Sequence, residues 1–191
     1  MTPKGAAALL SSLLTLLLLA APAGAEVRER ILAVVDDRPI LLTEVRVVER
    51  VLGLDTAGAL EKLIDEWLMF REAARIPQAA VAAEEEEQAL RGLLQSRPDL
   101  EGAVAEADLR RLARRQSAIL KYVNFRFRAQ IRIGDDRVRQ AYEDEYRGRP
   151  APPLAEVEEA LRERLARRDL SERIEAWVKE LRAAAEIRYN P

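Results

Sequence analysis

Histidine and cysteine are both absent from this chain. Without histidine no Ser-His-Asp or Cys-His catalytic site can form, and without cysteine the usual zinc ligands are missing. The lack of cysteine also excludes disulfides and the lipid attachment of a bacterial lipoprotein. There is no Gly-rich phosphate loop and no metal-spaced acidic set. We therefore expect no cofactor and no metal, and only carboxylate chemistry stays open as a route to catalysis.

Aromatic residues and long apolar runs are scarce as well. Three Phe, two Trp and four Tyr leave a core built mainly from Leu, Val, Ile and Ala. The one sustained apolar run, residues 6–20, is too short to span a bilayer comfortably. It follows Lys4 and precedes the small residues 23–25, which is the pattern of a signal peptide cleaved after Ala25. We expect residues 1–25 to be this signal peptide, residues 26–191 to form one domain, and no membrane span to remain after cleavage.

The remaining pattern predicts a mainly helical fold with a small antiparallel sheet. Short β-branched runs at 31–35 and 40–42 flank a turn and predict a hairpin. A last alternating segment, 186–190, predicts one more strand. Helices are predicted from three- and four-residue apolar spacing. They cover residues 43–52, 59–75, 82–95, 106–128, 135–146 and 154–185.

Residues 121–138 organise this plan, because they contain the end of one helix, a joint and the start of another. The buried stripe of the first helix is predicted to include Leu120, and Gly134 breaks the pattern. Asp135 is the predicted N-cap of the helix that follows Gly134, and Thr43 is the predicted N-cap of the helix at residues 43–52. Residues 148–153, rich in Pro and Gly, predict a linker. In the last helix the apolar phase slips after Leu165, which leaves a break near Asp169 open.

Charge and one apolar cluster stand out along this chain. The charged residues at 84–108 are mostly acidic, and those at 110–139 are mostly basic. These neighbouring helices are therefore expected to pack antiparallel. Because the acidic helix neutralises the basic one, we do not expect nucleic-acid binding. Residues 67–70 are Trp-Leu-Met-Phe and cover about 300° of a helix. Either this helix is buried on two sides, or part of this surface is left for a ligand.

Four segments in this order resemble SurA-type periplasmic chaperones: residues 30–45, 63–74, 125–138 and 173–189. In that family, parvulin-type prolyl isomerase domains usually sit between the joint helix and the closing helix. Here that place holds only the linker at 148–153, and the histidines typical of parvulin sites are missing. The resemblance thus implies the helical chaperone module, with its hairpin and last strand in one sheet, and no isomerase activity.

Two functions agree with this resemblance. The first is an ATP-independent periplasmic chaperone for unfolded outer-membrane proteins, with Trp67, Met69 and Phe70 as candidate client-binding residues. A cradle between the Arg-rich helix and the closing helix is an equal alternative. The second is an exported scaffold that holds one envelope partner. A carboxylate-only hydrolase is disfavoured, because the acidic residues lie on solvated helix faces, and we expect no enzymatic activity. The sequence does not indicate the oligomeric state.

Overall fold

The computed structural model describes residues 29–190, and its fold is mainly helical with one small antiparallel sheet. This confirms the expected fold class. The predicted signal peptide and Pro191 lie outside the described residues. Among the helices of residues 29–190, none combines the length and the apolar character needed to cross a bilayer.

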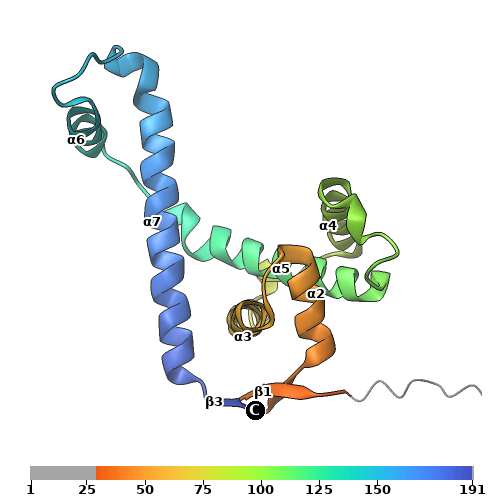
Figure 1. Ribbon diagram of the computed structural model, residues 1–191. Coiled ribbons are helices and arrows are strands. Elements are labelled where there is room, and N and C mark those ends of the chain that lie inside the picture. The colour runs from red at the N-terminus through yellow and green to blue at the C-terminus, as the bar shows by residue number, and fades with distance from the viewer. Residues whose placement is uncertain (1–28, 191) are drawn as a thin grey trace, which may run out of the picture.

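The sheet joins the two ends of the described chain. Its strands are β1 (Ile31–Val35), β2 (Arg38–Leu41) and β3 (Ile187–Tyr189), in the order β2-β1-β3. Ala33 pairs with Ile40 on one side and with Tyr189 on the other, both antiparallel. The central strand is therefore β1, and the predicted hairpin and closing strand are confirmed (Figure 1).

Asp36 connects the hairpin turn to the closing strand. Its backbone has a positive φ of 50°, a conformation that Asp tolerates better than most residues. Its backbone N–H donates to the Glu186 carbonyl at 2.8 Å, and its Oδ1 accepts from the Glu186 N–H at 2.9 Å. The Arg71 guanidinium also pairs with it. One turn residue thus holds the C-terminal strand against the N-terminal hairpin.

Four helices form the body of the molecule. They are α2 (Leu42–Leu52), α3 (Thr56–Ala73), α4 (Ala83–Ser96) and α5 (Glu106–Arg126). α3 begins three residues earlier than predicted, because the Asp55 carboxylate caps it by accepting from the Gly58 N–H at 2.8 Å. Thr43 is not a cap; Leu41 holds the N-cap position of α2, and its N–H donates to Glu44 at 3.2 Å.

The opposite charges of α4 and α5 meet as expected. Lys121 pairs with Glu85 at 2.8 Å, and Arg110 pairs with Glu87 at 2.9 Å. The earlier residue of α4, Glu85, pairs with the later residue of α5, so the two helices are antiparallel, as expected. Since most of these side chains are solvent-exposed, each pair contributes only about 0.2–1 kcal/mol.

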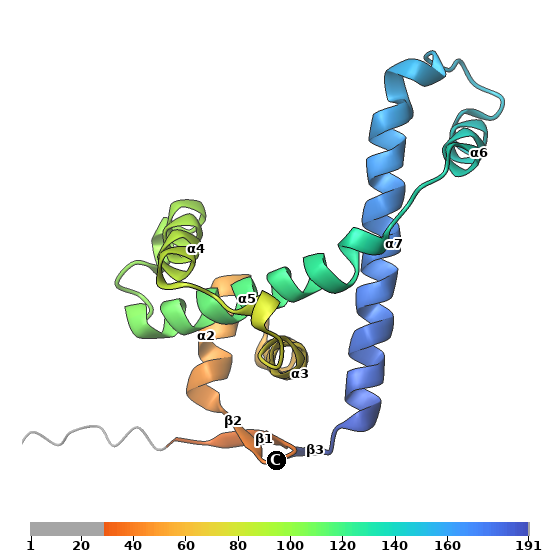
Figure 2. The ribbon, with the colours of Figure 1, turned by 180° about the vertical axis from the view of Figure 1, so that it is seen from behind.

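The last two helices, α6 (Asp135–Tyr146) and α7 (Leu154–Ala184), form an arm that extends from the body. α7 is continuous over 31 residues, about 46 Å. α6 lies on one side of its outer half and the body on the opposite side of its inner half (Figures 1 and 2). The short linker predicted at 148–153 joins α6 to α7 at the tip of this arm.

The two partners of α7 explain the phase slip that left a break near Asp169 open. Leu161 and Leu165 face α6, whereas Leu170 and Trp177 face the body. Leu161 and Leu170 are nine residues apart, two and a half helical turns, and so point in opposite directions. Asp169 lies within the helix. Its carboxylate accepts hydrogen bonds from Nη1 and Nη2 of Arg137 in α6, at 2.7 and 2.9 Å.

The joint between α5 and α6 differs in detail from the prediction. α5 ends at Arg126, two residues early, and a short 3-10 turn, Arg128–Gln130, follows. Gly134 holds the N-cap position of α6, so Asp135 is its first helical residue and not its cap. Phe127 at the end of α5 packs on Trp177 of α7, with ring centroids 5.4 Å apart. This contact fixes where the chain crosses α7.

Candidate functional site

The three predicted client-binding residues do not form a common exposed patch. Trp67 is half-buried against the sheet side of the core, with the Arg38 guanidinium 3.9 Å above its ring. Phe70 meets the edge of Trp67 at 5.6 Å but packs mainly on the α5 and α7 side. Met69 is only 7% exposed. Because α3 contacts the sheet and α2 on one side and α5 and α7 on the other, the expectation of a helix buried on two sides is confirmed. Client binding by these residues stays a prediction.

An apolar groove, here called the α5 groove, lies along α5. Its volume is about 320 Å³. Four helices line it: the end of α2, the middle of α3, the second half of α5, and α7. The lining residues are Leu52, Lys62, Glu66, Met69, Gln116, Ile119, Leu120, Val123 and Ile174.

The walls of the α5 groove are exposed leucines. Leu120 is 58% exposed and Leu52 is 42% exposed, whereas Met69 and Val123 are buried in its floor. Large apolar side chains that share one concave surface and face solvent are typical of a binding site. Of the three predicted residues, only Met69 contributes to this groove.

The exposure of Leu120 corrects the predicted buried stripe of α5. Ile119 and Leu120 are consecutive, so they point about 100° apart on the helix. Ile119 packs on the core with α3 and α7, and Leu120 is left in solvent beside the end of α2. The signal was present in the sequence: two adjacent apolar residues widen the apolar arc beyond what one packing partner covers.

A buried ion pair holds the groove open between α3 and α5. The Glu66 side chain accepts from Arg115 Nε at 3.1 Å and from Gln116 Nε2 at 3.3 Å. Glu66 is 3% exposed, and the Arg115 guanidinium also lies 5.7 Å from the Trp67 ring centroid. Because removal of one partner would leave a buried charge unpaired, this pair sets the spacing of the two helices firmly. The groove is therefore preformed, with Lys62 as a charged residue at its rim.

Comparison with known proteins gives no independent assignment. No family model matches the chain, and no curated protein matches it. The likeness to SurA-type chaperones therefore stays a resemblance of segments. Within residues 29–190, no group of three or more acidic residues is arranged to hold a metal ion.

Proposed function

We propose that this protein is an ATP-independent periplasmic chaperone that binds extended segments of unfolded outer-membrane proteins in the α5 groove. The observation that carries the proposal is the exposed apolar wall formed by Leu120 and Leu52 over a preformed floor. An open apolar surface with few polar groups makes few specific contacts, so it accepts many sequences with modest affinity for each. A groove open to solvent also lets a client leave without any input of energy.

The periplasmic location is part of the proposal and comes from the predicted signal peptide. Export with cleavage after Ala25 predicts a mature protein that begins at Glu26. N-terminal sequencing of the exported protein tests this directly. Retention of the apolar run 6–20 in the mature protein would contradict a soluble periplasmic chaperone.

Isomerase activity is not part of the proposed function. Prolyl cis/trans exchange has a barrier of about 18–20 kcal/mol, and lowering it requires a pocket that binds the twisted peptide better than the planar one. In relatives of the resembled family, a separate domain supplies that pocket between the helices that correspond to α6 and α7. Here residues 147–153 connect the two helices directly.

Both activities are measured on one preparation. Light scattering of a denatured barrel protein diluted into buffer should show slower aggregation at near-stoichiometric amounts of this protein, without ATP. A protease-coupled proline peptide assay should show no acceleration. Failure to slow aggregation would refute the chaperone proposal. A pull-down from periplasm that captures one partner in place of many would favour the exported scaffold.

A further inference from the structure

A second surface lies where the chain crosses α7 between the body and α6. On α7, residues 163, 166, 170, 173, 177 and 180 recur at three- and four-residue steps and therefore lie along one side of the helix. The crossing segment, residues 126–131, lies over this side and leaves a hollow above it and another below it. We call them the outer hollow, toward α6, and the inner hollow, toward the sheet. Each has a volume of about 350 Å³.

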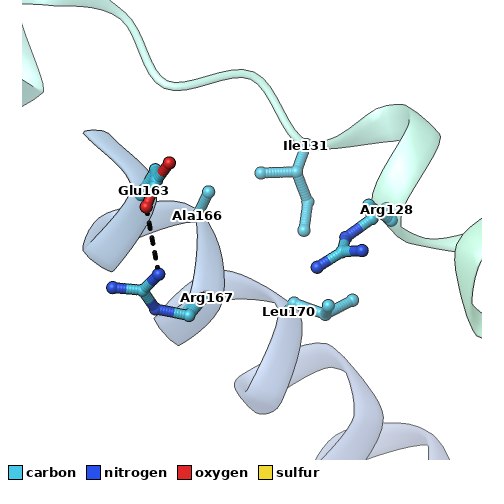
Figure 3. Close-up of a pocket in the computed structure, with 6 residues that line it drawn as sticks. All are labelled: Arg128, Ile131, Glu163, Ala166, Arg167 and Leu170. Atoms are coloured by element: carbon cyan, nitrogen blue, oxygen red, sulfur yellow. Dashed lines mark hydrogen bonds and ion pairs between the residues drawn. The ribbon is translucent and has the colours of Figure 1, made fainter. Parts of the chain in front are cut away.

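The base of the outer hollow is apolar, and two aromatic side chains lie at the base of the inner hollow, whose lining is otherwise mainly polar. In the outer hollow Ile131 of the crossing segment faces Leu170 of α7, with Ala166 beside them (Figure 3). In the inner hollow the floor is Phe127 and Trp177, and Trp177 stacks on Tyr122 with ring centroids 4.9 Å apart. Tyr122 and Trp177 are buried in the core, so the base of the inner hollow is held by core packing.

Arginines without a carboxylate partner surround these floors. Arg128 reaches into the outer hollow between Ile131 and Leu170 (Figure 3). Arg126 and Arg173 line the inner hollow. Within residues 29–190, none of the three has a carboxylate oxygen within 4 Å; Arg126 instead donates to the Tyr122 hydroxyl at 2.7 Å.

The other arginines of α7 are different in this respect. Arg162, Arg164, Arg167, Arg168 and Arg182 each have a carboxylate partner. Only two acidic side chains line the hollows, Glu163 and Glu180, and Glu163 is already paired with Arg167 at 3.2 Å. Four arginines against two glutamates leave an excess of positive charge. The surface is therefore apolar at its floor and cationic around it.

We infer that this surface binds an extended polypeptide segment that carries both acidic and apolar side chains. The carboxylates of the segment pair with Arg128 and Arg173, and its apolar side chains enter the two hollows. Leu170 and Trp177 are seven residues apart on α7, about 10.5 Å. The crossing segment lies between the two hollows, so a bound chain passes over it. The segment that fills both hollows is therefore longer than the roughly three extended residues that cover this distance.

The recessed position of the hollows favours a polypeptide over a lipid surface. The outer hollow lies in the corner between α7 and the segment that crosses it (Figure 3). The inner hollow is likewise lined by α7 and by residues 126–130 of that segment. A planar bilayer would meet the crossing segment and α7 before its headgroups reached the floors, whereas a single chain enters a corner. This surface shares no lining residue with the α5 groove. It lies between the Arg-rich helix and the closing helix, where the sequence offered a cradle as an alternative client site. The inference therefore rests on the proposed polypeptide binding but not on the α5 groove.

The test measures fluorescence anisotropy of a labelled twelve-residue peptide with leucine at every third position and Asp or Glu between. The same peptide with Asn and Gln in place of the acids is the comparison. We expect the acidic peptide to bind more tightly, and its affinity to fall as salt rises. The variant Arg128→Gln/Arg173→Gln should bind it roughly three- to tenfold more weakly, since each exposed charge pair contributes little.

The matched control is Arg46→Gln/Arg91→Gln, which removes two exposed arginines from α2 and α4 and makes the same change in net charge. It should bind the acidic peptide as the unaltered protein does. Leu120→Ala in the α5 groove should leave the preference for the acidic over the neutral peptide unchanged, so failure of the chaperone proposal is seen separately. Equal affinity for the acidic and the neutral peptide, or full affinity in the Arg128/Arg173 variant, would overturn the inference. So would binding to anionic phosphatidylglycerol vesicles that this variant abolishes while the peptide does not bind.

Discussion

Leu120→Ala is the sharpest test of the α5 groove, because it removes apolar surface that the folded protein hardly uses. Complete burial of a leucine side chain is worth about 1.5–3 kcal/mol. Leu120 is 58% exposed, so a bound client can bury at most that share, roughly 0.9–1.7 kcal/mol. The dissociation constant of a client peptide should therefore rise roughly four- to seventeenfold. Folding stability should fall by about 1 kcal/mol or less, since the rest of the side chain is lost and alanine is the best helix former.

The matched control for this prediction is Phe125→Ala. Phe125 lies on the same helix, is 54% exposed and does not line the groove. Titration of a labelled apolar peptide with each variant, together with urea unfolding of each, separates affinity from stability. The groove is the binding site if Leu120→Ala weakens binding and Phe125→Ala does not. Unchanged affinity in Leu120→Ala, or an equal loss in both variants, would refute the reasoning.

Three further predictions concern the sheet and its surroundings. Deletion of residues 186–191 should lower the melting temperature and promote aggregation, because the central strand β1 becomes an open edge; an unchanged melting temperature would contradict a structural role of β3. Trp67→Ala should destabilise the protein by roughly 2–3 kcal/mol in urea, below the ~3–5 kcal/mol of a fully buried aromatic residue; normal stability with lost client binding would instead make Trp67 a site residue. The pKa of Asp36 is held below its ordinary value by the backbone N–H of Glu186, with Arg71 adding to the effect. The stability it contributes is therefore present above the unfolded-state pKa, about 3.9, and is lost as pH falls through the lower folded-state value. Asp36→Asn should be less stable than the unaltered protein at pH 7, and the difference should shrink as the pH falls below about 3.9; a difference that does not change with pH would show that this charge has no role.

The elements that the sequence predicted well are those defined by local signals. The hairpin has β-branched runs on both sides of a tight turn. Three helix boundaries lie beside Gly or Pro: Gly53 follows α2, Gly134 precedes α6 and Pro153 precedes α7. The third strand was predicted from a short alternating segment, and its pairing with β1 came from the resemblance to a family fold. Thr43 and Asp135 failed as caps because a good capping residue is not a cap unless it sits one residue before the first helical turn.

The continuity of α7 illustrates what periodicity alone does not contain. A phase slip in an apolar stripe has two physical causes: a break in the helix, or a change of packing partner from one face to another. Only the positions of α6 and the body distinguish these two causes, and those positions depend on the tertiary structure. The same reason applies to Leu120, whose apolar character is local but whose exposure depends on where α2 ends.

The run at residues 67–70 shows why a cluster of large apolar residues in the sequence does not have to form an exposed surface. Four consecutive large apolar residues do exceed what one partner can cover, but α3 has partners on both sides: Leu68 enters the core beneath the sheet, and Met69 enters the core toward α5 and α7. The surplus apolar surface lies instead on α5, a helix with strong charge on both sides of its apolar stripe and therefore less conspicuous in sequence. Because Met69 forms the floor of the groove that Leu120 walls, packing of α3 determines the shape of the groove, and α5 supplies apolar surface that remains exposed.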